Sequence, residues 1–253
     1  MTLSIGIDSG STATKGILLE DGVIRRRFLT PTPFRPADAI VEAWETLRAG
    51  LEVRPFLTLT GYGRQLVDFA DKQVTEISCH GRGARLLLPE TRTVIDIGGQ
   101  DSKVIQLDED GNLTDFLMND KCAAGTGRFL EVISRTLGAS VEQLDALTAG
   151  VEPHMITSMC TVFAESEVIS LRSAGVPPEA ILAGVGYAMA RRSANFISRL
   201  SAQGPLQFTG GVSHCAAFGR RLSEHVNMPV HTHPDAQFAG AIGAAMIGQR
   251  MRK

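Results

Sequence analysis

Two short motifs carry residue types that bind phosphate, and the second repeats the spacing of the first. Each has an aspartate, a glycine and a lysine at the same intervals: Asp8, Gly10 and Lys15, then Asp96, Gly98 and Lys103. A glycine turn between two strands exposes consecutive backbone N–H groups, which bind phosphate oxygens. An aspartate at the strand end can hold Mg²⁺, which prefers one or two carboxylates with phosphate oxygens and water. Two facing turns would hold one triphosphate from both sides.

Each motif adds further groups suited to a phosphate. In DSGSTATK these are hydroxyls and one ammonium: Ser9, Ser11, Thr12, Thr14 and Lys15. In DIGGQDSK they are the turn and two polar side chains: Gly98, Gly99, Gln100 and Ser102. Ordinary hairpins with polar tips are the alternative, but two copies at matched spacing favour phosphate binding. The P-loop pattern GxxxxGK[ST] and the dinucleotide pattern GxGxxG are both absent.

A third glycine element, FTGGVSHC, lies near the C-terminal end of the chain. A strand-like run ends at Gly210 and Gly211, and Val212 leads toward a helix-like run. Two glycines allow the backbone to approach a flat ligand closely. A plain strand-to-helix turn is the alternative. This element is therefore a candidate contact for a nucleotide base or ribose.

The segments around the two phosphate motifs predict the same order of elements in each half. Each reads as strand, glycine turn, strand, Asp-Gly hairpin and strand, with third strands over 23–30 and 113–119. Apolar spacing predicts further helices over 37–50, 75–88, 126–137, 141–147, 161–173, 179–200, 216–225 and from about 236. Further strands are predicted over 56–61, 205–211 and 229–233. We expect an α/β fold of two similar domains, 1–90 plus 236–253 and 91–235, with a ligand cleft between them.

Composition narrows the function classes. The chain has 253 residues and a formal net charge of −2, which gives no support to a nucleic-acid surface. The most apolar run, AGAIGAAMIG, is too short to span a bilayer. The start, MTLSIGIDSG, lacks the basic and apolar regions of a signal peptide. We therefore expect a cytoplasmic protein without a membrane or nucleic-acid partner.

The four cysteines lie far apart, without a CxxC pair. Cys122 in NDKCAAGTGRFLE and Cys160 in CTVFAESEVISL each precede a helix-like run. A helix N-terminus favours anions and stabilises a thiolate, and thiolates are the ligands of iron–sulfur clusters. A buried small residue is the ordinary role of a free cysteine, and it remains the expectation for Cys79 and Cys215. Two cysteines cannot complete a four-thiolate site, so a cluster would need two subunits.

The order of the three glycine elements resembles that of the ATPase superfold of actin, sugar kinases and heat-shock chaperones. That resemblance covers the whole chain. It implies that the first two turns hold the β- and γ-phosphates and that the third holds adenosine. It also implies that AGAIGAAM is a hinge helix that returns to the first domain.

A narrower resemblance rests on GIDSGSTATKG, VIDIGGQDSK, NDKCAAGTGRFLE, CTVFAESEVISL, FTGGV and AGAIGAA. These motifs resemble the activator ATPases (component A) of 2-hydroxyacyl-CoA dehydratases and the ATPase subunits of benzoyl-CoA reductases, within the BadF–BadG–BcrA–BcrD ATPase family. The resemblance implies ATP, Mg²⁺ and one [4Fe–4S] cluster per homodimer, held by Cys122 and Cys160 of each subunit. It also implies one-electron transfer to a dehydratase, reductase or double-cubane cluster protein, with a ferredoxin or flavodoxin as donor.

These expectations give each candidate residue a role. Metal and phosphate binding is expected from Asp8, Gly10, Ser11, Thr12, Lys15, Asp96, Gly98, Gly99 and Lys103. The hydrolytic water is expected near Gln100, Asp101 or Asp120, and adenosine near Gly210, Gly211 and Val212. A sugar or amino-sugar kinase of the same superfold and a non-catalytic ATP-gated regulator are the alternatives, and neither would hold iron.

Overall fold

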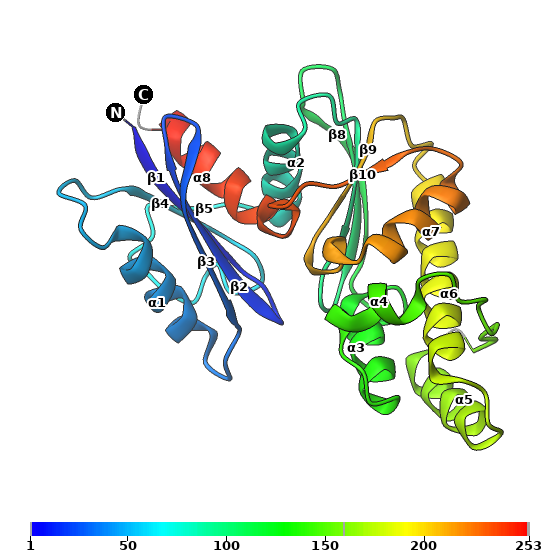
Figure 1. The fold of residues 1–253 in the computed structure, drawn as a ribbon. Helices are drawn as coiled ribbons and strands as arrows, with labels where there is room; N and C mark the ends of the chain where they lie inside the picture. Colours follow the sequence, from blue (N-terminus) through cyan, green and yellow to red (C-terminus); the bar gives the residue numbers. More distant parts are fainter. Residues whose placement is uncertain (1, 159, 252–253) are drawn as a thin grey trace.

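The fold is built on two five-stranded sheets of the same design (Figure 1). The computed structural model describes residues 2–158 and 160–251. The first sheet has the order β3-β2-β1-β4-β5, from β1 (Leu3–Ser9), β2 (Ala13–Glu20), β3 (Val23–Pro31), β4 (Phe56–Thr60) and β5 (Lys72–Gln73). The second has the order β10-β9-β6-β7-β8, from β6 (Thr93–Ile97), β7 (Ser102–Leu107), β8 (Leu113–Asn119), β9 (Leu206–Thr209) and β10 (Val230–His231).

The internal repeat is confirmed at the level of strand pairing. In both sheets the first three strands of the repeat are antiparallel, and the next strand joins the first in parallel. The motif residues occupy equivalent register positions, because Asp8 pairs with Lys15 and Asp96 pairs with Lys103. The Asp21-Gly22 hairpin has positive φ at both residues, as a tight hairpin turn requires.

Eight α-helices are described, and most match the predicted ranges. They are α1 (Pro36–Arg48), α2 (Glu76–Leu87), α3 (Gly127–Thr136), α4 (Leu144–Thr148), α5 (Thr161–Ser173), α6 (Pro178–Ser198), α7 (Ala216–Val226) and α8 (Ala239–Met251). The helix expected over 141–147 divides into a 3₁₀ turn and the short α4. The helix expected from about 236 also begins with a 3₁₀ turn, over Ala236–Phe238.

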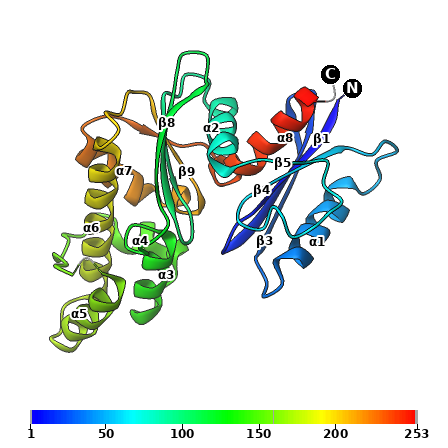
Figure 2. The same cartoon turned by 180° about the vertical axis from the view of Figure 1, so that it is seen from behind.

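Alternation along β1 and β6 points both aspartates into the space between the sheets. Along β1, Ile5 and Ile7 pack with α1, whereas Ser4 donates its hydroxyl to the Ala245 carbonyl of α8. Side chains two residues apart share one face of a strand, so Asp8 points toward α8 as Ser4 does. Along β6, Val94 packs with α2, and Asp96 shares that face. The opposite face of the second sheet is covered by α3 to α7 (Figures 1 and 2).

Helices α2 and α8 lie between the two sheets and cross each other closely (Figures 1 and 2). A Cβ at Gly83 would overlap the Ala239 carbonyl, and one at Gly243 would overlap the Cys79 carbonyl. Such a backbone-to-backbone contact is available only to glycine. The expected domain limits assign α2 to the first domain, because the helix precedes residue 90. In the structure α2 also packs on the second sheet.

The two sheets are covered by helices that bury long aliphatic side chains. Within residues 2–158 and 160–251, every helix is too short or too polar to cross a membrane. The core of the second sheet is the larger, since five helices contribute to one of its faces. That helical layer carries the third glycine element and the segments around Cys122 and Cys160.

Adding one methyl group at the helix crossing tests this packing. We expect Gly243→Ala to destabilise the protein by about 1–3 kcal/mol, because the new Cβ must displace the α2 backbone. Gly219→Ala in α7 is the matched control, since a Cβ there meets open space. It should be neutral or stabilising by up to about 1 kcal/mol. Urea denaturation measures both, and equal midpoints would contradict the close crossing.

Candidate functional site

The ends of β1 and β6 bring Asp8 and Asp96 to the two sides of one histidine. Both carboxylates are buried, with exposures of 5% and 2%. His80 of α2 lies between them, with Nδ1 3.0 Å from Asp96 Oδ1 and Nε2 3.8 Å from Asp8 Oδ2. The contact between Nδ1 and Asp96 is an ion pair when the imidazole is protonated. The imidazole therefore links the two halves of the internal repeat.

The protonation of this cluster is set by its opposite charges. Burial alone would lower the pKa of His80, but the Asp96 carboxylate outweighs it and raises the pKa. Burial alone would raise the pKa of Asp96, yet His80 and Lys103 together hold it far below its usual range. Thr209 of β9 also donates a 2.8 Å hydrogen bond to Asp96 Oδ1. Asp96 is therefore a carboxylate, whose charge His80 and Lys103 balance.

The two motif lysines have different surroundings, although their spacing is the same. The Lys103 ammonium is buried and lies 2.7 Å from Asp101, 3.0 Å from Glu76 and 3.8 Å from Asp96. Those carboxylates raise its pKa despite the burial. The expected direct contact of Lys103 with phosphate is revised: we propose that it orients Asp96 and Asp101.

Lys15 keeps its ammonium available at the first glycine turn. Within the described chain, no carboxylate lies within ion-pair distance of Lys15. A Cβ built at Gly10 would lie 4.0 Å from Lys15 Nζ, so the ammonium stands beside the turn. Thr32, at the end of β3, braces the turn by donating a 2.8 Å hydrogen bond to the Gly10 carbonyl. A fixed turn beside an unpaired cation suits a phosphate group.

The two glycine turns face each other and touch. A Cβ at Gly99 of the second turn would overlap Thr12 Oγ1 of the first. Ser11, Thr12 and Gln100 are exposed at these turns, where a ligand can reach them. The close approach explains the glycine at position 99, because any side chain there would separate the turns. The prediction that the two turns hold one triphosphate from both sides stays a proposal, and this placement supports it.

Helix α8 begins directly against the aspartate–histidine cluster. A Cβ at Gly240 would come within 2.6 Å of Asp8 Oδ2 and 2.8 Å of His80 Nε2. On the other side, a Cβ at Gly61, whose φ is +88°, would crowd Asp8 Oδ1. Both oxygens of Asp8 are thus enclosed by backbone. Movement of α8 relative to α2 would change the surroundings of Asp8 and His80 together.

The second turn is joined by backbone hydrogen bonds to the start of α3. The amides of Gly127 and Arg128 donate to the carbonyls of Gly98 and Gly99, each at 2.8 Å. The chain between β8 and α3 is the turn that carries Cys122. A displacement of the second glycine turn would therefore be transmitted to the first residues of α3, next to this cysteine turn.

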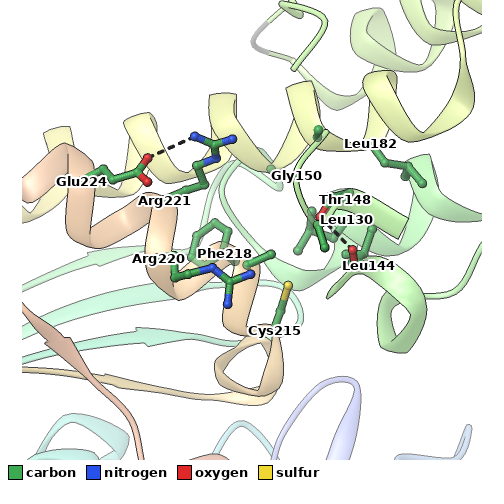
Figure 3. Close-up of a pocket in the computed structure, with 14 residues that line it drawn as sticks. Leu130, Leu144, Thr148, Gly150, Leu182, Cys215, Phe218, Arg220, Arg221 and Glu224 are labelled. Carbon is green, nitrogen blue, oxygen red and sulfur yellow. Dashed lines mark hydrogen bonds and ion pairs between the residues drawn. The ribbon is translucent and has the colours of Figure 1, made fainter. Parts of the chain in front are cut away.

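The third glycine element leads into a cavity of about 180 Å³ between α4, α6 and α7 (Figure 3). Gly210 has φ +90°, and a Cβ there would overlap the Ile97 carbonyl of β6. The 3₁₀ turn Gly211–His214 then reaches Cys215 at the cavity wall. Apolar side chains such as Leu182 and Phe218 line the cavity, and arginines stand at its edge. It is smaller than the ~300–1,000 Å³ of typical ligand pockets, so it suits one flat ring system and not a whole nucleotide.

Two of the four cysteines are at least partly exposed, and the other two are buried. Cys122 is partly exposed: Arg192 Nη2 lies 3.7 Å from its Sγ, and Asn119 donates a 2.9 Å hydrogen bond to its carbonyl. Cys160 is exposed at the N-cap of α5. Burial raises the pKa of Cys79 to about 12 and that of Cys215 to about 11, so both stay protonated thiols.

These surroundings fit a shared four-thiolate cluster better than a site within one chain. Within the described residues, no group of three or more potential metal-ligating side chains forms. One chain offers two accessible thiols, Cys122 and Cys160, and the Arg192 guanidinium lies beside the first. Two chains would supply the four thiolates of a [4Fe–4S] cluster.

Not every predicted residue lies free at the two glycine turns, and the sequence did not predict several residues of the site. Asp120 pairs with Lys121 at 3.1 Å and lines a different cavity beside α6, so its placement does not support a role at the hydrolytic water. Asp101 forms an ion pair with Lys103.

The sequence interpretation missed His80, Glu76, Thr209, Thr32 and Arg192. No local pattern marks them, although the helical spacing of 76, 80 and 83 could have placed His80 on the same face as Glu76.

Comparison with known proteins agrees with this geometry. The Escherichia coli K12 protein YjiL is 82% identical over 252 residues, covering 100% of this chain and 99% of that protein. The (R)-2-hydroxyglutaryl-CoA dehydratase activating ATPase of Acidaminococcus fermentans is 43% identical, covering 98% and 97%.

Solved structures extend the likeness to three dimensions. The activator of the 2-hydroxyisocaproyl-CoA dehydratase from Clostridium difficile with bound ADPNP superposes with a TM-score of 0.92, at 38% identity, covering 99% of this chain and 95% of that one. A ROK family glucokinase from Streptomyces griseus has a TM-score of 0.64 at 16% identity, covering 98% and 99%, and shares the actin-like fold alone. The profile of the BadF/BadG/BcrA/BcrD ATPase family matches residues 5–248, and the chain belongs to that family.

Proposed function

We propose that this protein is an ATP-hydrolysing activator that sends single electrons to a 2-hydroxyacyl-CoA dehydratase-like or double-cubane cluster protein. The observation that carries the proposal is the pair of hydrogen bonds from Gly127 and Arg128 to the second phosphate turn. They join the nucleotide site to the turn that carries Cys122. Relatives named as dehydratase activators, similar over nearly their full length, support the same reading.

Nucleotide binding divides between the two halves of the repeat. Lys15 and the hydroxyls of Ser11 and Thr12 bind phosphate oxygens from the first half, and the Gly98-Gly99 backbone binds them from the second. Asp8 and Asp96 hold Mg²⁺ through water. The cavity between α4, α6 and α7 receives the adenine ring, with Gly210 and Gly211 allowing the ribose to approach. The close approach of the two turns, Gly99 against Thr12, supports a triphosphate held between them.

Among the three candidates for the hydrolytic water, Gln100 is the best placed. Its side chain is exposed on the second turn, and within the described residues no hydrogen bond to it is found. Asp101 is instead occupied by Lys103, and Asp120 lies beside α6. We therefore assign the positioning of water to the Gln100 amide. Because ADP leaves the space of the γ-phosphate vacant, the two turns separate after hydrolysis.

Closure of the turns on ATP moves the segment that holds the thiolates. The second turn pulls on the α3 N-terminus. The Cys122 turn follows because Thr126, the N-cap of α3, donates hydrogen bonds to the Ala123 carbonyl from its amide and its hydroxyl. Cys122 and Cys160 of two chains together hold the cluster. When bound, the [4Fe–4S] cluster supplies the one-electron chemistry. The thiolate-bearing segments determine its solvation, and hence its access to an acceptor.

Iron analysis after anaerobic purification tests the electron-transfer part. We expect about four irons and four sulfides per dimer. Cys122→Ala and Cys160→Ala should each lose most of the iron, because each removes two of the four thiolates. Cys79→Ala, which removes a buried cysteine, is the control and should retain iron. A wild-type protein that is iron-free and fully active as an ATPase under these conditions would contradict the proposal.

Removal of the available lysine tests the phosphate site. We expect Lys15→Ala to lower kcat/KM for Mg·ATP hydrolysis by about 100-fold or more, since it removes a preorganised charge on the phosphate. Lys72→Ala, at an exposed lysine of β5, is the matched control. The iron content should be the same in both variants. Hydrolysis at the wild-type rate in Lys15→Ala would refute the phosphate assignment.

A bulky side chain in the small cavity tests the assignment of the adenine. Gly186 lines it, and a Cβ there meets open space, so Gly186→Leu fills the cavity without a backbone clash. We expect the Kd for ATP to rise about tenfold, while that for inorganic triphosphate stays unchanged. Gly219→Leu, on α7, is the control. Equal weakening of both ligands in Gly186→Leu would show that the cavity does not hold the base.

A further inference from the structure

A second and larger cavity, of about 470 Å³, lies between the C-terminal half of α6 and the turn after β8. Its charged side chains are four cations and one carboxylate: Lys121, Arg191, Arg192, Arg199 and Asp120. The buried hydroxyl residues Ser102 and Ser193 lie deeper in its wall. The net charge of the lining is therefore positive, which attracts an anionic ligand.

This cavity is separate from the nucleotide site. Ser102 and Lys103 are consecutive on β7, and consecutive residues of a strand point to opposite faces of the sheet. Lys103 reaches Asp96 and Glu76 on the α2 side. Ser102 therefore faces the α6 side, where the cavity lies. A ligand in this cavity would not compete with a triphosphate for the glycine turns.

The cations of the cavity have no counter-charges on α6. Within the described chain, Arg191 and Arg199 have no carboxylate within ion-pair distance, and Arg199 instead lies over the Phe196 ring. By contrast, Arg128 and Arg221 on α3 and α7 each pair with a glutamate of their own helix. The only carboxylate of the lining, Asp120, is already paired with Lys121. The arginines thus form an unneutralised cluster.

Helix stabilisation does not account for these arginines. A cation near a helix C-terminus offsets the helix dipole only within the last turn. Arg199 is the C-cap of α6 and fits that role, but Arg191 and Arg192 lie well before the end of the helix at Ser198. Their charges therefore serve something outside the helix.

The cavity adjoins the proposed cluster ligand. Arg192 lines it and also approaches Cys122 Sγ at 3.7 Å. Gly125, in the same turn, has φ +92°, and a Cβ there would lie 3.3 Å from Arg192 Cδ. The cysteine turn is thus shaped around this arginine. A partner anchored in the cavity would be held next to the redox site.

We propose that the cavity receives the carboxylates of an acidic electron-carrier protein, so that the carrier docks beside Cys122. This inference rests on the proposed function, and it names the surface at which one electron enters: the carrier is oxidised by one electron, and the activator gains that electron. Met118 and Phe196 also line the cavity. Arginine with aromatic and methionine side chains is the composition of a protein interface.

A small free phosphate suits the cavity less well. Many phosphate sites combine arginines with clustered backbone N–H groups or a helix N-terminus. Here the neighbouring helix presents its C-terminal half, whose carbonyl end carries partial negative charge. Lys121, Arg191 and Arg199 are instead exposed, where the carboxylates of a protein surface can reach them.

Binding of an acidic peptide tests the cavity without any cluster. The probe is fluorescein-labelled hexaglutamate, measured by anisotropy at low salt, with the wild-type protein, Arg191→Gln/Arg199→Gln, and the control Arg35→Gln/Arg250→Gln. Arg35 and Arg250 are exposed arginines outside the cavity. We expect the first variant to weaken binding about tenfold and the control to bind as wild type, with binding lost at high salt. Equal binding by both variants would overturn the proposal.

The rate of electron transfer from a reduced carrier tests whether the partner that binds this cavity is an electron carrier. Reduced ferredoxin with two [4Fe–4S] clusters is mixed with the oxidised holoprotein under anaerobic stopped flow. We expect the second-order rate to fall about tenfold in Arg191→Gln/Arg199→Gln at low salt and to be unchanged in the control variant. ATP hydrolysis and iron content should match wild type in both, because neither pair belongs to the nucleotide or cysteine sites.

The outcomes separate this inference from the proposed function. An unchanged electron-transfer rate, despite weakened peptide binding, would overturn the carrier assignment. Displacement of hexaglutamate by micromolar pyrophosphate at constant ionic strength would instead identify a small phosphate site and contradict a protein partner. An iron-free wild-type protein would contradict the electron-transfer function itself. The peptide experiment would still show whether the cavity binds carboxylates.

Discussion

The structure depends on two buried carboxylates that share one histidine. Asp8 and Asp96 end equivalent strands of the two sheets, and each would be costly to bury alone. His80 lies within 4 Å of both, so it joins the two halves through their charges. Lys103 supplies the remaining positive charge on the Asp96 side. His80 thus links Asp8 and Asp96, which we propose as the Mg²⁺-binding residues, to helix α2.

The same helix connects the site to the packing between the two halves. Helices α2 and α8 cross at Gly83 and Gly243, so a change in their angle acts directly on His80, which lies one turn from Gly83. On the far side, α3 is tied to the second glycine turn through Gly127. Nucleotide binding would therefore act at two places. One is the crossing of α2 and α8 between the halves, and the other is the start of α3 next to Cys122. We propose that their combined movement converts the presence of the γ-phosphate into a changed environment for the thiolates.

Much of the fold could be predicted from the sequence because its signals are local. The Asp-Gly hairpins and the repeated motif predicted both three-stranded units, and apolar spacing predicted the helices within a few residues. Strand β5 was missed because two residues, Lys72 and Gln73, carry no pattern. The site was harder to predict, since equal spacing suggested equal roles for Lys15 and Lys103. Their difference comes partly from Asp101, whose position in the first motif is taken by Ala13, and partly from α2, which places Glu76 beside Lys103 alone. The second pairing joins distant elements and leaves no trace in local spacing.

Hydrogen exchange of the anaerobic holoprotein, with and without Mg·ADPNP, tests the central coupling most directly. The amides of Gly127 and Arg128 donate to the second phosphate turn and adjoin the Cys122 turn. If the turn and α3 move as one unit, nucleotide will change exchange over 98–101 and over 122–128 together, and the Gln100 turn will become more protected. Protection confined to 98–101, with unchanged exchange over 122–128, would contradict the link between the nucleotide and the cysteine turn.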